Sequence, residues 1–178
     1  MYKNRLRFVA IALLSCVATF SACEYSAIKE YYNDPQRYSE IWKLSGVRDP
    51  LEEENTIFPK DLSGLGVVTL FCRYDQQYPL GEGVQILLEV KYEDGEDFQK
   101  KMDELSQQCF GVDEYFTGVE KVFAVRFWDD YSMEYAVVNE DEQSISYIYL
   151  QSLPKDEIEI DEKFIPIGYC DYGKVEKL

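Results

Sequence analysis

The chain has 178 residues, of which 34 are acidic and 18 basic, giving a formal net charge of -16, and it contains no histidine. The negative charge excludes a nucleic-acid partner, because phosphate backbones would be repelled. The lack of histidine excludes Ser-His-Asp and Cys-His catalysis and histidine zinc sites. No glycine-rich phosphate loop occurs, and the sequence predicts neither a cofactor nor a metal site.

The first 22 residues have the three parts of a secretory signal peptide. Three basic residues lie within the first seven positions, residues 8–20 form an apolar run, and Ser21 and Ala22 are small. The apolar run is too short to cross a bilayer core, which needs roughly 20 apolar residues. We therefore expect residues 1–22 to be removed and the mature chain to lie outside the cytoplasm.

The segment Phe20-Ser21-Ala22-Cys23 resembles the lipobox of bacterial lipoproteins, in which an aliphatic residue and two small residues precede a lipidated cysteine. Phe20 stands where that family usually has leucine. The resemblance implies a diacylglyceryl group on Cys23, and two acyl chains hold a protein at a membrane where one chain is marginal. It therefore implies a lipid anchor on the extracytoplasmic face of the cell membrane, which is the periplasmic side in a host with two membranes.

Two alternatives stay open for this region. The run Leu13-Leu14-Ser15-Cys16 contains the leucine, leaves a shorter apolar stretch, and would place the lipid on Cys16. Ordinary secretion with cleavage near Ser21 would leave Cys23 as a plain thiol. Each alternative removes basic residues and leaves a more acidic mature domain, which we expect to stand off anionic lipid head groups.

Residues 23–33 are predicted to form a tether or a short helix that leads into the domain. Ile28, Tyr31 and Tyr32 have the spacing of one helix face. Residues 34–178 are predicted to form a single globular domain, because a chain of this length is enough for one core and short for two.

A helix is predicted between Asp34 and Gly46. Asp34 is its N-cap, Pro35 occupies the first helical position, and Gly46 lies just past its end. Its apolar face, which should dock on the domain, consists of Tyr38, Ile41 and Trp42.

Residues 67–74 and 84–92 alternate apolar and polar side chains and are predicted to form a β-hairpin, with residues 75–83 as its loop. An amphipathic helix is predicted over residues 96–109, and Gly111 closes it. The apolar positions that recur at helical intervals in it are Phe98, Met102, Leu105 and Cys109.

Three further strands are predicted at residues 121–128, 133–139 and 144–150, joined by short acidic turns. A last edge strand is predicted around Ile158 and Ile160, where acidic residues alternate with isoleucine. The order β-β-α-β-β-β predicts an α+β fold, with an antiparallel sheet, a main helix on one face and an additional N-terminal helix.

Four aromatic residues are candidates for ligand binding: Trp128, Tyr135, Tyr147 and Tyr149. If they shared the sheet face away from the main helix, they would form a surface of the kind that binds peptides or sugars. The alternative is that the helix at residues 34–46 packs on that face and makes it a second core layer.

Acidic turns supply further candidates, namely Asp113-Glu114, Asp129-Asp130 and Glu140-Asp141-Glu142. Paired carboxylates suffice for glycoside hydrolysis, and acidic turns also offer oxygen ligands to calcium. Solvated acidic residues are nevertheless ordinary in turns, and residues 113–118 lack the alternating ligands of an EF-hand loop.

The remaining cysteines are Cys72, Cys109 and Cys170, and no CxxC pair occurs among them. Outside the cytoplasm two of them could pair and leave one free, or all three could be buried free thiols.

These features predict a membrane-anchored extracytoplasmic lipoprotein that acts as a binding or interaction module, with an envelope protein or peptide as a candidate partner. The alternative is a carboxylate-dependent envelope hydrolase that acts on cell-wall glycans.

Overall fold

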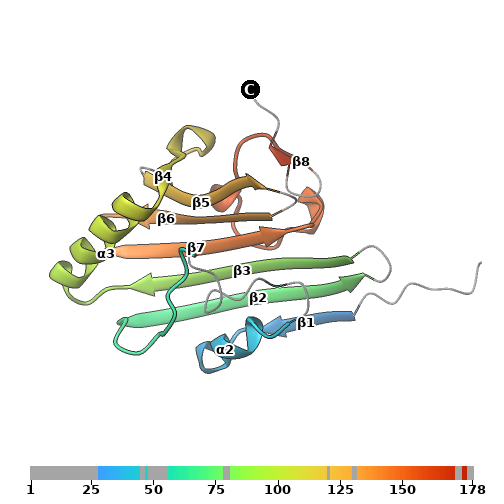
Figure 1. Ribbon diagram of the computed structural model, residues 1–178, viewed down its shortest axis with the longest axis horizontal. Coiled ribbons are helices and arrows are strands. Elements are labelled where there is room, and N and C mark those ends of the chain that lie inside the picture. Colours follow the sequence, from blue (N-terminus) through green and yellow to red (C-terminus); the bar gives the residue numbers. More distant parts are fainter. Residues whose placement is uncertain are drawn as a thin grey trace, which may run out of the picture.

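A seven-stranded antiparallel sheet dominates the computed structural model of the chain (Figure 1). The structure describes residues 28–44, 47, 56–77, 81–119, 121–129, 132–170 and 174–175. The strand order in the large sheet is β1-β2-β3-β7-β6-β5-β4, and β8 and β9 form a separate pair. The strands are β1 Ile28–Tyr32, β2 Val67–Gln77, β3 Gly81–Lys91, β4 Phe110–Gly111, β5 Lys121–Asp129, β6 Ser132–Asn139, β7 Ser144–Gln151, β8 Tyr169–Cys170 and β9 Lys174–Val175.

Helices are few among the described residues. The longest is α3 (Gly95–Gln108), and α2 (Tyr38–Ile41) is a single turn. Four 3-10 turns complete the set: η1 Pro35–Arg37, η2 Asp113–Tyr115, η3 Lys155–Glu157 and η4 Glu162–Phe164. The predicted α+β class with an antiparallel sheet is therefore confirmed at this coarse level.

The hairpin β2–β3, the helix α3 and the meander β5–β6–β7 lie where the sequence predicts them. The Asp94 side chain accepts a hydrogen bond from the Glu96 amide at 2.7 Å and so caps the start of α3. β2 and β3 extend further than predicted, so that the loop between them is shorter. β7 pairs with β3 as well as β6, and this pairing joins the hairpin and the meander into one sheet.

The prediction of a tether or helix before Asp34 is wrong for residues 28–32, which form the edge strand β1. Ile28 pairs with Gln76 and Tyr32 pairs with Cys72 in an antiparallel register. β1 forms because β2 offers a free row of backbone donors and acceptors along its outer edge, and that gain outweighs local helical spacing. Residues 23–27 lie outside the described part of the chain.

The helix predicted over residues 34–46 is shorter than expected and consists of η1 and α2. Its start is as predicted, because the Asp34 side chain accepts from the Gln36 amide at 2.9 Å and proline follows it. The last α-helical residue is Ile41, with Trp42 as C-cap. Gly46, the predicted end, lies outside the described residues.

The last predicted edge strand, around Ile158 and Ile160, does not form. Instead, η3 and η4 bracket this stretch, and side chains of the sheet bind its backbone. The Gln85 side-chain oxygen accepts from the Glu159 amide at 2.8 Å, and the Arg73 guanidinium donates to the Glu157 carbonyl. These bonds hold the segment across the sheet face rather than along the sheet edge.

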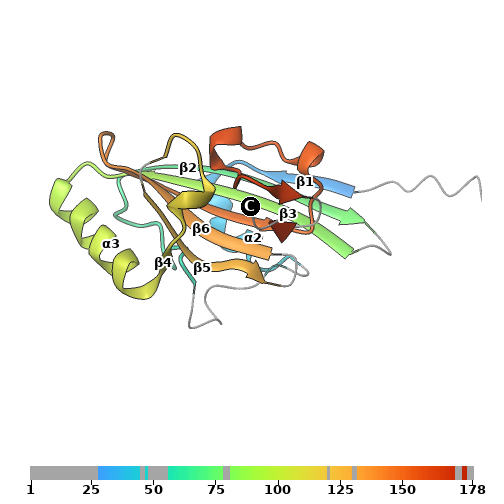
Figure 2. The same cartoon turned by 90° about the horizontal axis from the view of Figure 1, so that it is seen from above.

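One sheet face, here called the helix face, carries both α3 and α2. Figure 2 shows α3 and α2 on the same side of the sheet. Phe98, Met102 and Leu105 of α3 belong to the same core as Ile41 and Trp42, which follow η1. The residues of β3 that enter this core are Val84, Ile86, Leu88 and Val90. The N-terminal helix therefore packs on the same sheet face as the main helix. The alternative in which it covers the opposite face is wrong.

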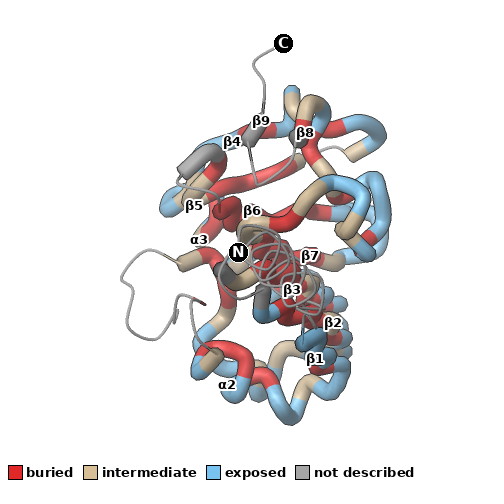
Figure 3. Tube along the Cα trace, turned by 90° about the vertical axis from the view of Figure 1, so that its right-hand side faces the viewer, coloured by how far each residue is buried: buried red, intermediate tan, exposed pale blue. Residues whose placement is uncertain are grey.

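The other face, here called the strap face, is covered by residues 112–119 and by the C-terminal segment 153–170. Phe116, Ile160 and Phe164 pack there against Tyr135 and Ile148 of the sheet. Because both faces are covered, the central strands β6 and β7 are buried over most of their length, whereas the edge strand β1 is mostly exposed (Figure 3).

A buried arginine fastens the C-terminal segment to the strap face. The Arg73 side chain is 1% exposed and donates to the Asp75 carboxylate, which is fully buried. It also reaches the Glu157 carboxylate at 2.7 Å and the Glu159 carboxylate at 2.8 Å. Burial by itself lowers the pKa of Arg73, but these bonds and charges together raise it above its ordinary value, so the guanidinium stays charged.

Candidate functional site

A pocket of about 310 Å³ opens on the strap face, at the end of the sheet where the β6–β7 turn lies. Its lining comes from four parts of the chain that are distant in sequence: β3, the loop before β5, the β6–β7 hairpin, and η4. The residues are Glu89, Gly118, Val119, Val137, Val138, Asn139, Asp141, Glu142, Ser144, Ser146, Lys163 and Phe164. We treat this pocket as the candidate functional site.

One row of cross-strand neighbours forms the sheet side of the pocket. Ser146 on β7 pairs with Glu89 on β3 and with Val137 on β6. Because side chains alternate along a strand, all three point to the strap face together. Glu89 is exposed, whereas Ser146 is only 7% exposed.

The Glu89 carboxylate is held by hydroxyl groups from both neighbouring strands. Thr69 donates to it at 3.2 Å from β2, and Ser146 donates to it at 3.4 Å from β7. Both bonds are long, and a carboxylate has about four acceptor positions. Glu89 is therefore oriented by its neighbours while it keeps acceptor capacity for a further donor.

The β6–β7 turn contributes exposed carboxylates at the rim. The Asn139 side chain accepts from the Glu142 amide at 3.1 Å, and the Gln143 amide bonds to the Glu140 carbonyl at 3.3 Å. Gln143 has a positive φ of 50°, which completes the reversal of the chain. This turn places Asp141 and Glu142 on the pocket side.

The wall opposite the sheet comes from η4. The Lys163 ammonium lies 4.7 Å from the centre of the Phe164 ring and 3.9 Å from the Asp161 carboxylate. The Tyr135 hydroxyl donates to the Phe164 carbonyl at 2.6 Å and so ties this wall to the sheet. Burial raises the pKa of Tyr135 well above its ordinary value, which keeps the hydroxyl a donor.

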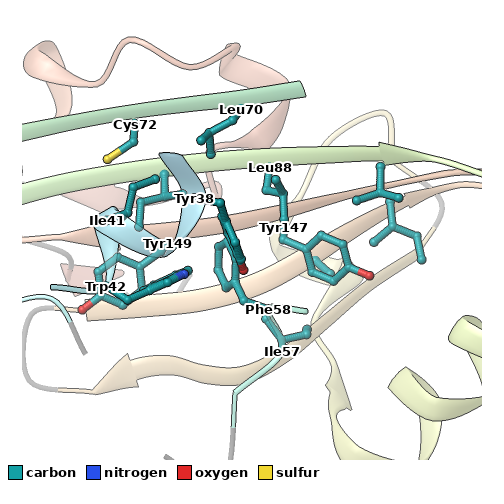
Figure 4. Close-up of a cluster of buried hydrophobic side chains, with 14 of the residues drawn as sticks. Tyr38, Ile41, Trp42, Ile57, Phe58, Leu70, Cys72, Leu88, Tyr147 and Tyr149 are labelled. Carbon is teal, nitrogen blue, oxygen red and sulfur yellow. The ribbon is translucent and has the colours of Figure 1, made fainter. Parts of the chain in front are cut away.

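Three of the four aromatic residues proposed as a ligand surface are separated and buried. Tyr147 and Tyr149 point to the helix face and are 0% and 2% exposed, beneath Trp42 and Phe58 (Figure 4). Tyr135 points to the strap face and is also fully buried. The expectation of one exposed aromatic surface is therefore wrong for these three tyrosines, because covering segments pack on both faces. The side chain of Trp128 is not among those that the structure describes.

The covering of the helix face is aromatic and closely packed. The Phe58 ring lies 5.8 Å from the Tyr147 ring and 5.2 Å from the Trp42 ring. The hydroxyl groups of Tyr92 and Tyr147 approach to 3.4 Å. Burial raises the pKa of Tyr147, so this pair stays uncharged in the core. These contacts account for the tyrosines as core residues.

The acidic turns proposed as catalytic or calcium sites have different surroundings. Asp113 and Glu114 lie in η2, and Glu140 pairs with Lys121 at 2.8 Å. Asp141 and Glu142 line the pocket. The structure describes neither the side chain of Asp129 nor any part of Asp130. Within the described part of the chain, no three His, Cys, Asp or Glu residues are grouped closely enough to hold a metal ion.

The two cysteines whose side chains are described, Cys72 and Cys109, are not among the residues that line the pocket. Cys72 and Cys109 are free cysteines, and burial raises the pKa of Cys72 to about 12 and that of Cys109 to about 11. The side chain of Cys170 is not among those described. Cys16 and Cys23 also lie outside the described residues, and none of the helices described is long and apolar enough to span a membrane.

Sequence reasoning identified Asp141 and Glu142 as turn residues but missed the rest of the pocket. Glu89 is the clearest missed signal, because it is an acidic residue in a strand whose other face is entirely apolar. Lys163 and Phe164 carried no signal, since only the folding of the C-terminal segment across the sheet brings them to Glu89.

Comparison with known proteins adds no relative. No family model matches the chain, and the searches of curated proteins and of solved structures likewise found no match.

Proposed function

We propose that this protein is a lipid-anchored extracytoplasmic binding protein, held at the cell membrane through Cys23 and binding a small ligand in the pocket on its strap face. The N-terminal sequence supports the anchor, and the pocket supports the binding role. The observation that carries the binding role is a concave site on which four separate segments converge and to which several of them bring polar groups.

The start of β1 sets a short distance between anchor and domain. Four residues separate Cys23 from Ile28, the first residue of β1, so even a fully extended link reaches at most about 18 Å. In the proposal, the end of the sheet that contains Ile28 is therefore the end nearest the membrane. The 23–33 tether of the sequence analysis is shorter than expected, because β1 takes up its second half.

The pocket lies toward the other end of the sheet. Ile28 pairs with Gln76, Gln76 pairs with Glu82, and Glu89 lies seven residues further along β3. At about 3.3 Å per residue, this places the pocket row roughly 23 Å from the anchored end. The net negative charge disfavours a sheet that lies flat on an anionic bilayer, and an upright sheet would present the pocket to the surrounding solution.

Membrane attachment is tested with three forms of the full chain made in a bacterial host: unchanged, Cys23→Ser and Cys16→Ser. We expect the unchanged chain and the Cys16→Ser chain to incorporate labelled fatty acid and to sediment with membranes. The Cys23→Ser chain should do neither. A mature N-terminal peptide with an unmodified Cys23, identified by mass spectrometry, would contradict the anchor.

The hydrolase remains the second candidate because Glu89, Asp141 and Glu142 line one pocket. Glycosidases need a carboxylic acid whose surroundings keep it protonated, together with a second carboxylate. All three residues are exposed, which favours binding over this chemistry. Release of reducing ends from cell-wall glycans by the purified protein, abolished by Glu89→Gln or Asp141→Asn, would favour the hydrolase instead.

A further inference from the structure

The charge of the pocket favours a cationic ligand. Glu89, Asp141 and Glu142 contribute three carboxylates to its lining, and Lys163 contributes one ammonium. Lys163 already has the Asp161 carboxylate at 3.9 Å and the face of the Phe164 ring at 4.7 Å. The pocket therefore has an excess of negative charge within a chain whose net charge is -16, and the field attracts cations toward it.

The spacing of these carboxylates favours an organic cation over a metal ion. A divalent ion needs several oxygen ligands within about 2.6 Å, and the described residues contain no group of three acidic residues arranged for one. The pocket volume of about 310 Å³ lies at the lower end of the range for small-molecule sites. A small ligand with its charge on an amine can contact the separated carboxylates one at a time.

The remaining lining groups suit a ligand with hydroxyl groups on a carbon frame. Ser144 offers a hydroxyl group, and the Ser146 hydroxyl, which donates to Glu89, keeps its oxygen as an acceptor. The Asn139 side-chain oxygen already accepts a backbone amide, which leaves its two N–H groups as donors. Val119 and Val137 supply apolar surface between these polar groups.

We propose that this pocket binds a small polyhydroxylated primary amine of the amino-sugar class, with its ammonium group on Glu89. This inference rests on the proposed binding function and specifies its ligand class. Glu89 is the expected partner because Thr69 and Ser146 orient its carboxylate from both sides.

Isothermal titration of the full mature chain in neutral detergent tests the ligand class. The probes are glucosamine, glucose and N-acetylglucosamine, which share a sugar ring and differ in charge at one position. We expect glucosamine to bind about tenfold more tightly than either neutral sugar, the gain of one charge-assisted hydrogen bond. Its affinity should fall between 50 mM and 500 mM salt, because screening weakens an exposed ion pair.

Two variants locate the effect. Glu89→Gln should weaken glucosamine binding about tenfold, while Glu140→Gln, which removes the same charge from the same end of the sheet outside the pocket, should leave it within about twofold. Both residues are exposed, so both variants should fold, and their melting temperatures check this. Equal losses in the two variants would overturn the proposal, because the general field would then be the cause.

The failure of the ligand class is distinguishable from the failure of the binding function. If glucose binds as tightly as glucosamine and Glu89→Gln weakens both, the cationic class is wrong but the pocket binds. If none of the three sugars binds the unchanged chain at 10 mM, a concentration at which a binding free energy of about 3 kcal/mol would be detected, both proposals are overturned.

Discussion

Replacing Arg73 by methionine should destabilise the domain strongly, because it leaves a charge buried without a partner. Asp75 is fully buried, and its carboxylate accepts hydrogen bonds from the Arg73 guanidinium. Removing one member of a buried ion pair costs about 3 to 5 kcal/mol. Glu157 and Glu159 are 35% and 41% exposed and can turn to water, so their loss adds little.

The total of about 4 kcal/mol for Arg73→Met is a large part of the roughly 5 to 15 kcal/mol by which domains are stable. It should lower the melting temperature by roughly 8 to 16 °C, at about 2 to 4 °C per kcal/mol for a chain of this size. Urea unfolding followed by circular dichroism measures the free energy directly. The control is Lys121→Met, which breaks the exposed pair with Glu140 and should cost less than about 1 kcal/mol.

A double variant separates the buried charge from the lost contacts. Arg73→Met with Asp75→Leu leaves no buried carboxylate and should recover at least half of the loss, since apolar replacements of buried pairs are often neutral. If Arg73→Met costs no more than Lys121→Met, or if the double variant is less stable than Arg73→Met alone, the argument from burial is refuted.

Three further outcomes are expected. Tyr147→Ala should cost about 3 to 5 kcal/mol of unfolding free energy in urea, because the ring is fully buried against Phe58, and a cost below about 1 kcal/mol would contradict its place in the core. Iodoacetamide at pH 8 should leave Cys72 and Cys109 largely unmodified in the folded chain and modify both in urea, because burial raises the pKa of each thiol. Rapid modification of the folded chain, seen by peptide mass spectrometry, would refute this. Stability should hold up to about pH 9 and then fall, because the Cys72 pKa rises from 9.0 to about 12 on folding and the unfolded state loses its proton first. Between those two pH values Cys72 alone lowers the unfolding free energy by about 1.4 kcal/mol per pH unit. Under reducing conditions, the unfolding free energy of Cys72→Val should therefore decline less steeply with pH, and an unchanged slope would contradict the role of Cys72.

Local sequence patterns determined the central elements of the fold. The alternation in β2 and β3, the helical spacing of Phe98, Met102 and Leu105, and the cap at Asp94 each depend on neighbours a few residues away. Such signals are present in the sequence itself because strand and helix periods repeat over short distances. The proposed signal peptide is also a local pattern, and its reading at Cys23 rests on sequence alone.

Tertiary structure decided which faces are covered. The sequence shows that Tyr135, Tyr147 and Tyr149 are aromatic but not that two different segments bury them. The pairing of β1 with β2 and the crossing of residues 153–170 over the strap face each depend on a partner surface that is remote in sequence. Propensity therefore predicted a helix or tether before Asp34 and a strand near Ile158, and long-range hydrogen bonds overrode both.

The candidate site was decided almost wholly by the tertiary structure. Glu89 and Lys163 are separated by more than 70 positions in the sequence and line the same pocket. Composition determined that the protein is acidic and lacks histidine chemistry, because charge and residue type need no fold. Only the antiparallel register and the C-terminal segment that Arg73 holds across the sheet brought those charges to one concave place, because burial of that segment is a property of the whole domain.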